Sequence, residues 1–298
     1  MAVFTKNRSN PAYEAARIGA DRAAAAFGAV TTHHVPAVAD DVAQQIALVH
    51  EVLAAPPDGI VFVPVHETEV NAAIESITAA GIPIANPIAR MTAGQPLTFV
   101  GSDNEALAFD VARYLLRHIG GCGRVLMLEG IAASATTAPR TRGFLVALAE
   151  FPEVRLIGRL TGDYQRGVAR TAVSDWLDAR ADRGAPLDAV LAANDVMALG
   201  ALDALSGRGW QVPVIGINAL PEAIDAIRSG QLLATVDFDA MKIAHIATEA
   251  LLRHLRGERV PKEITLPVQI VDRSNFAAWD RPLAQRDCLR WEDVVARA

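Results

Sequence analysis

One pattern recurs along this chain and limits the folds available to it: a short apolar run, a polar residue at its end, and then a helical stretch. The clearest copy covers residues 187–205, where an unbroken run of Ala, Val and Leu at 189–193 leads into a helix that begins near Asp195. Such a run suits a parallel strand covered on both faces. Asp195 is expected to cap the helix, because a carboxylate can accept the free N–H groups of the first turn.

Asn194 stands between this strand and this helix and has no comparable local role in the sequence. In open α/β sheets, ligands bind in the crevice beyond the carboxyl ends of the strands. We therefore predict that Asn194 faces a ligand cleft, and that the polar residues ending the other strands face the same cleft.

The pattern runs through two successive series, which predicts two doubly wound parallel-sheet α/β lobes of similar size. In the first series we expect strands at 3–5, 30–34, 58–64, 82–85 and 97–101, and helices at 11–27, 41–53 and 68–80. In the second we expect strands at 124–128, 155–160, 187–193, 213–217, 233–236 and 264–271, and helices at 105–118, 141–150, 166–181, 195–205, 221–229 and 241–255. No Pro/Gly/Ser-rich linker separates the series, so short hinge segments should connect the lobes.

Length and charge narrow the class of protein. A chain of 298 residues is long enough for about two domains. Its net charge of −6 argues against a surface for nucleic acid. No apolar run approaches the ~20 residues of a membrane-spanning helix. The sequence leaves open whether Cys122 and Cys288 pair, and it contains no Cys/His cluster that predicts a metal site.

The first residues already read as a strand, with no basic and apolar leader before them. This leaves two interpretations open: a cytoplasmic protein, or a chain that starts inside a mature secreted protein.

Nine stretches, in order, carry a resemblance to a known family: residues 9–11, 58–64, 80–84, 100–104, 128–131, 140–144, 194–200, 214–218 and 233–236. Among them are Ser9-Asn10-Pro11 at the start of the first helix and the strand-to-helix stretch that contains Asn194. Over residues 1 to about 271 the chain resembles the periplasmic sugar-binding proteins of the ribose-binding type, which serve ABC transporters.

The resemblance implies a type I periplasmic binding protein: two lobes joined by a three-segment hinge and closing over one sugar. It places the crossings near Asp103, Asp237 and Ile264. The first lobe would then hold residues 1–103 and 238–264, and the second 104–237 and 265–298. It also implies a monomer that lies in the periplasm, has no enzymatic activity and no cofactor, and delivers its ligand to a permease in the inner membrane.

Carried over position by position, the resemblance implies a substrate-binding set, in which Arg90 matches only if a one-residue insertion is allowed. Arginine and asparagine provide planar groups with several donors for adjacent hydroxyls, and aromatic rings can cover the C–H face of a sugar. The set is Asn10, Tyr13, Arg90, Arg140, Tyr164, Asn194, Asn218 and Phe238.

The chain departs from the family pattern in its acidic positions. The family often has an Asp just before the arginine, where this chain has Ala89, and a second ligand Asp where it has Asn218. A hinge glutamine is replaced by Phe238, and a pair of aromatics after Asn-Pro by Ala12-Tyr13. Losing two carboxylate acceptors changes which hydroxyls are bound, because charged hydrogen bonds are the strong ones. We therefore expect a different pentose, a tetrose or a sugar alcohol rather than ribose.

Two other functions are compatible with the fold. The first is the effector-binding domain of a LacI-type transcription regulator, whose helix-turn-helix would have to precede Met1. The second is an enzyme acting on a sugar or nucleotide. Against the enzyme, the sequence contains no catalytic dyad, metal set or phosphate-binding loop.

Overall fold

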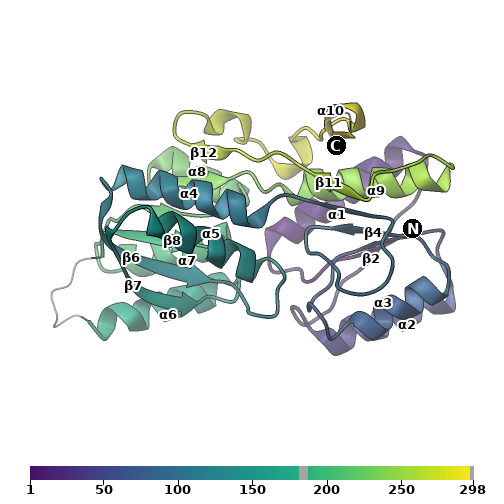
Figure 1. The fold of residues 1–298 in the computed structure, drawn as a ribbon, viewed down its shortest axis with the longest axis horizontal. Helices are drawn as coiled ribbons and strands as arrows, with labels where there is room; N and C mark the ends of the chain where they lie inside the picture. Colours follow the sequence, from purple (N-terminus) through teal and green to yellow (C-terminus); the bar gives the residue numbers. More distant parts are fainter. Residues whose placement is uncertain (181–186, 296–298) are drawn as a thin grey trace.

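The computed structural model describes residues 1–180 and 187–295, which fold into two lobes lying side by side along the long axis (Figure 1). Each lobe is built around one six-stranded sheet with helices packed on it. The predicted architecture, two α/β lobes built on mostly parallel sheets, is confirmed.

The first sheet has the strand order β11-β5-β4-β3-β1-β2, with every neighbouring pair parallel. Alternate residues of its strands enter two different cores: Ile60 and Phe62 pack into one, and Val61 into the other. The strands are therefore covered on both faces, as continuous apolar runs predict. The strands are β1 (Ala2–Phe4), β2 (Thr32–His34), β3 (Ile60–Phe62), β4 (Ile84–Pro87), β5 (Thr98–Gly101) and β11 (Glu263–Thr265). The helices of this lobe are α1 (Pro11–Ala26), α2 (Val42–Ala54), α3 (Asn71–Ala79) and α9 (Ala240–Leu255).

The second sheet has the order β12-β10-β9-β8-β6-β7, and only its edge strand β12 is antiparallel. Its strands are β6 (Cys122–Glu129), β7 (Glu153–Thr161), β8 (Ala189–Ala192), β9 (Val214–Ile215), β10 (Ala234–Val236) and β12 (Ile270–Asp272). Its helices are α4 (Asn104–His118), α5 (Thr137–Ala149), α6 (Arg166–Asp178), α7 (Asp195–Ser206) and α8 (Pro221–Ser229). The part of the helix predicted at 166–181 that covers residue 181 lies outside the described residues.

Between β1 and β12, three chain segments cross between the lobes, as predicted. They run from β5 to α4, from β10 to α9 and from β11 to β12. The prediction of one last strand at 264–271 is wrong, because this stretch forms two strands that belong to different sheets. The physical reason lies in the hinge: residues 266–269 carry the chain from one sheet to the other, and Pro267 has no N–H to continue a ladder.

The C-terminal tail beyond β12 contacts both lobes. Its 3₁₀ turn η2 (Phe276–Ala278) contacts α8, whereas η3 (Leu283–Gln285) contacts α1 and α10 (Trp291–Val295) contacts β11. The sequence interpretation assigned the whole of 265–298 to the second lobe, but the tail from η3 onward packs on the first.

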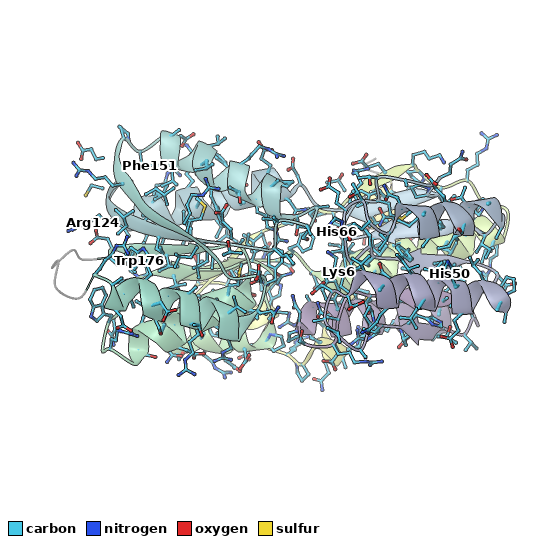
Figure 2. All side chains as sticks on the ribbon, turned by 90° about the horizontal axis from the view of Figure 1, so that it is seen from below. Lys6, His50, His66, Arg124, Phe151 and Trp176 are labelled. Atoms are coloured by element: carbon cyan, nitrogen blue, oxygen red, sulfur yellow. The ribbon has the colours of Figure 1, made fainter. Side chains whose placement is uncertain are left out.

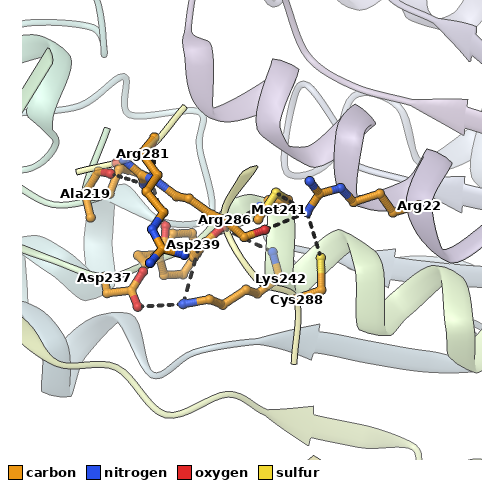
Figure 3. A network of polar contacts seen from close by, with 11 residues as sticks. Arg22, Ala219, Asp237, Asp239, Met241, Lys242, Arg281, Arg286 and Cys288 are labelled. Atoms are coloured by element: carbon orange, nitrogen blue, oxygen red, sulfur yellow. Dashed lines mark hydrogen bonds and ion pairs between the residues drawn. The ribbon is translucent and has the colours of Figure 1, made fainter. Parts of the chain in front are cut away.

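A buried charge network attaches this tail to the hinge (Figure 3). Arg286 is 5% exposed, and its Nη1 donates to the carbonyl of Ala219 in the second lobe at 2.6 Å. Nη1 of Arg22, on α1 of the first lobe, donates to the carbonyl of Arg286 at 2.6 Å. Beside them, Nζ of Lys242 lies 2.9 Å from Asp237 and 3.5 Å from Asp239. The tail therefore bridges the two lobes through directly bonded polar groups.

Both cysteines are free, Cys122 exposed at the start of β6 and Cys288 half-buried in the tail. Of the helices within the described ranges, none has the length and apolar character needed to cross a membrane.

Candidate functional site

A small cavity of about 40 Å³ lies between the two lobes. The two lobes touch beside it: the backbone N–H of Glu67 donates to the carbonyl of Ala133 at 3.2 Å, and Nζ of Lys6 donates to Oγ of Ser134 at 3.3 Å. The lobes are therefore closed over the cavity. Its lining includes Lys6, Asn7, Asn10, Tyr13, Asp40 and Ile88 from the first lobe, Ile131, Thr136, Arg140, Tyr164, Asn194 and Asn218 from the second, and Phe238 from the hinge.

Seven of the eight predicted site residues line this one cavity, although they are spread over more than two hundred positions of the chain. They are Asn10, Tyr13, Arg140, Tyr164, Asn194, Asn218 and Phe238.

Arg90, the eighth, does not line the cavity. Its Nη2 lies 2.7 Å from Oε1 of Glu263 and its guanidinium stacks over Phe99 at 3.9 Å, in a separate groove. The reason is local: Asn86, fully buried, donates to the carbonyl of Ala89 at 2.8 Å and accepts from the N–H of Met91 at 2.9 Å. These bonds hold the loop so that Ile88 faces the cavity instead, and Arg90, matched only with a one-residue insertion, lies outside the cavity.

Arg140 lies on α5 and is held by two hydrogen bonds within its own lobe, one to α4 and one to the residue that follows β8. Its Nε donates to Oδ1 of Asn104 at 2.9 Å and its Nη1 to the carbonyl of Ala193 at 2.6 Å. The guanidinium lies 4.9 Å from the ring of Phe238 and is 3% exposed. Burial lowers the pKa of Arg140, against the opposing pull of Tyr164, Tyr13 and Asp195. Nη2 has no protein partner among the described residues, so it is available to a ligand.

Asn194, rather than Asp195, caps the helix that follows β8. Oδ1 of Asn194 caps α7 by accepting from the N–H of Met197 at 2.9 Å. Asp195 is fully buried and accepts from Oγ1 of Thr235 at 2.6 Å and from the N–H of Leu220 at 2.9 Å. Burial raises the pKa of Asp195 to about 6, and those two hydrogen bonds oppose the rise. The predicted cap by Asp195 is therefore wrong, and the amide nitrogen of Asn194 remains available on the cavity side.

A chain of hydroxyl groups forms one wall of the second lobe. Oγ of Ser134 lies 3.1 Å from Oγ1 of Thr136, which lies 3.0 Å from the phenol of Tyr164. Gly130 makes room for this phenol ring, because a Cβ at that position would come within 2.1 Å of it. In the first lobe, Asn10 caps α1 by accepting from the N–H of Ala12 at 3.0 Å, as predicted.

Sequence reasoning missed two charged residues of the cavity, Lys6 and Asp40. Lys6 is 3% exposed and lies at the inner end of the first lobe, beside the second (Figure 2). Burial lowers the pKa of Lys6 to about 8, against the attraction of Asp40. Its position carried a usable signal: it is polar and follows β1 directly after Thr5, as Asn194 follows β8.

Non-glycine residues with a left-handed backbone conformation cluster around the cavity. Of the six non-glycine residues with positive φ in the described ranges, four line the cavity: Asp40, Ile88, Tyr164 and Asn218. A branched residue such as Ile88 at φ 69° is rare and costs energy. Such strain persists where the surrounding structure holds it, which is typical of functional sites.

Metal chemistry has no support in the part of the chain that the structure describes, where no group of three or more His, Cys, Asp or Glu side chains is placed to hold an ion.

Comparison with known proteins gives consistent matches. A family described as "Periplasmic binding protein domain" matches residues 1–259. The ribose import binding protein RbsB of Bacillus subtilis (strain 168) is 28% identical over 231 residues, which cover 78% of this chain and 74% of that protein. A xylitol-binding protein of Mycolicibacterium smegmatis is 27% identical over 197 residues, which cover 66% of this chain and 56% of that protein. A crystal structure of an ABC transporter periplasmic solute binding protein from Actinobacillus succinogenes 130z, with bound D-allose, has a TM-score of 0.86 and 27% identity, covering 92% of this chain and 98% of that one.

Proposed function

This chain belongs to the periplasmic binding protein domain family, and from that premise we propose that it is the solute-binding component of a carbohydrate ABC transporter. It binds a small sugar or sugar alcohol between its lobes, and a pentose, a tetrose or a polyol fits better than ribose. It delivers this ligand from the periplasm to a permease in the inner membrane. It acts as a monomer, without a cofactor and without catalysis.

The observation that supports the proposal most directly is the origin of the cavity lining. Asn10 and Tyr13 come from the first lobe, Arg140 and Asn194 from the second, and Phe238 from a hinge crossing. A ligand held by all of them contacts both lobes only when they are closed. It would therefore shift the population toward the closed form, which is how a hinged clamp captures its ligand.

The residues around the cavity support a polyhydroxylated ligand. Arg140, Asn194 and Asn218 offer planar donors, and Tyr13, Tyr164 and Phe238 offer aromatic surface. Asn218 stands where the ribose-binding pattern has a carboxylate, which is the basis for preferring another ligand over ribose.

A thermal-shift screen of pentoses, tetroses, hexoses and the corresponding alditols tests the proposal. A ligand that binds only the folded chain stabilises it by about 2.7 kcal/mol at a hundredfold excess over its dissociation constant. We expect a clear shift with one ligand or one small group of ligands. We also expect X-ray scattering to show a more compact chain with that ligand than without it.

Two variants and one control complete the test. Arg140→Ala should abolish the shift, whereas Arg142→Ala, two positions along the same helix and on an exposed ion pair with Glu105, should keep it. Asn194→Asp keeps the oxygen that caps α7 but loses the amide donors, so it separates binding from helix stability. No shift with any ligand in the screen, together with none for the corresponding sugar acids, would overturn the proposed function.

A further inference from the structure

Lys6 is a buried cation without a counter-ion in contact. Its only polar contact among the described residues is the one from Nζ to Oγ of Ser134, at 3.3 Å. An ammonium group carries three donors, so two of them have no protein partner. Burying a charge is expensive unless it is paired, and a neutral hydroxyl cannot balance it. The side chain lines the cavity, so the missing partner belongs to whatever occupies the cavity.

The charges that line the cavity do not balance. Lys6 and Arg140 are cations, and Asp40 is the one anion among the described lining residues. Asp40 is held by Nδ2 of Asn7 at 3.0 Å, and its left-handed backbone, at φ 60°, fixes its position. Asp195 lies behind Asn194, outside the lining, and both of its oxygens accept hydrogen bonds from the second lobe. The lining therefore carries one positive charge in excess.

The remaining polar groups of the cavity are suited to hydroxyls. Thr136 and Tyr164 provide hydroxyl groups that can donate or accept, and Asn218 provides an amide. A ligand that pairs with the excess positive charge and also bonds to these hydroxyl and amide groups has several hydroxyls and one negative charge.

We propose that the ligand is a sugar acid, a polyhydroxylated monocarboxylate of four or five carbons, and that Lys6 binds its carboxylate. This inference rests on the proposed function, the capture of a small polyhydroxylated solute between the lobes, and replaces the neutral sugar or sugar alcohol with the corresponding acid. Arg140 and the hydroxyl wall of the second lobe bind the ligand hydroxyls. Because Lys6 belongs to the first lobe, its bond to the carboxylate adds a charged contact between the lobes in the closed form.

Matched ligand pairs test the assignment by isothermal titration calorimetry on the full chain at pH 7. D-Erythronate is compared with erythritol, and D-xylonate with xylitol, since each pair differs in one terminal group. We expect the acid to bind at least about tenfold more tightly than its alcohol, the size of effect that hydrogen bonds to charged groups produce. Lys6→Gln should remove this preference and Lys6→Arg should keep it. Lys262→Gln, the same charge change on an exposed side chain, should leave both affinities unchanged.

The outcomes separate the two proposals. If an alcohol binds as tightly as its acid or more tightly, the sugar-acid inference is overturned and the proposed function stands. If Lys6→Gln weakens both members of a pair equally in a variant that melts like the parent chain, the assignment of the carboxylate to Lys6 is overturned. If no acid, alcohol or sugar binds at all, the proposed function fails, and this inference fails with it.

Discussion

Two lysines of this chain, the buried Lys6 and the half-buried Lys242, are partnered in different ways. Lys242, beside the hinge, lies within 2.9 Å of Asp237 and 3.5 Å of Asp239. Lys6, in the cavity between the lobes, contacts only a serine hydroxyl among the described residues. Burial lowers the pKa of both amines. At Lys242 the two carboxylates outweigh burial and the net pKa is raised, whereas at Lys6 burial outweighs Asp40 and the pKa falls to about 8.

The difference separates a structural charge from a binding one. Lys242 has its partners within the chain, so its charge is satisfied in every state that keeps the hinge intact. Lys6 is satisfied only when something else enters the cavity. A buried cation without a partner destabilises the closed form when no ligand is bound, and a ligand that supplies the partner recovers that cost.

The largest expected effect on the free energy of unfolding comes from removing Lys242, the lysine with ion-pair partners. Lys242→Met leaves Asp237 and Asp239 buried without their cation, and should lower the free energy of unfolding by about 3–5 kcal/mol. Urea denaturation measures this as a lower midpoint at an unchanged slope. Lys262→Met, on an exposed side chain, should stay within about 0.5 kcal/mol of the parent chain. A loss below about 1 kcal/mol in Lys242→Met would show that the two lysines do not differ as the structure indicates.

Removing the unpaired lysine should have the opposite sign. The pKa of Lys6 falls from 10.5 to about 8 on folding, so the unfolded chain holds the proton more tightly between those values. The contribution of Lys6 to the free energy of unfolding therefore rises with pH from about 8 to about 10.5. Without ligand at pH 7, Lys6→Met should raise the free energy of unfolding by up to about 3 kcal/mol, at ~1.36 kcal/mol per pKa unit. A destabilised Lys6→Met would place Lys6 among the structural charges.

The affinity for an acidic ligand should depend on pH above the pKa of Lys6. We expect it to fall about tenfold per pH unit above pH 8, about 1.4 kcal/mol per unit, because the neutral amine no longer attracts a carboxylate. Asp40, Tyr13, Tyr164 and Arg140 also face the cavity. Burial, with Asp40 and Tyr164 nearby, raises the pKa of Tyr13 well above 10, so its phenol stays neutral at pH 8. Calorimetry between pH 6.5 and pH 9.5 measures the slope, and Lys6→Arg should flatten it, since arginine stays charged.

A smaller effect is expected from disturbing the hydroxyl wall opposite Lys6. In Gly130→Ala the new Cβ meets the ring of Tyr164 at 2.1 Å, so the phenol must move away from Thr136. Ligand affinity should fall by about 1 kcal/mol, roughly the cost of a mild overpacking. Gly167→Ala is the matched control, because nothing lies within 4 Å of its new Cβ. Equal affinities in the two variants would exclude Tyr164 from the binding surface.

Much of the fold could be predicted because its signals are local. Apolar runs indicated the strands, and Asn10 before Pro11 marked the start of the first helix, which the structure confirms. The single strand predicted at 264–271 failed because both of its halves are strand-like, and nothing local indicates that they join different sheets.

The sequence prediction placed Asn194, which follows a strand, and Arg140, which lies on α5, at the cavity that both line. It was mistaken where the outcome depended on a distant partner. Asp195 is drawn from the helix cap by Thr235 and Leu220, which lie 40 and 25 positions along the chain. Arg90 was misplaced for a local reason, because the bonds of the buried Asn86 to the backbone of Ala89 and Met91 turn Ile88 toward the cavity instead.

The sequence by itself therefore determined the elements, their order and the two-lobed architecture, because apolar periodicity and helix capping depend on neighbours a few residues apart. Only the tertiary structure decided which polar side chains pair and which remain unpaired. Lys6 and Ser134 are 128 positions apart and meet only when the lobes close. The state of a buried charge depends on the partners that folding brings within a few ångströms, and those partners come from both lobes.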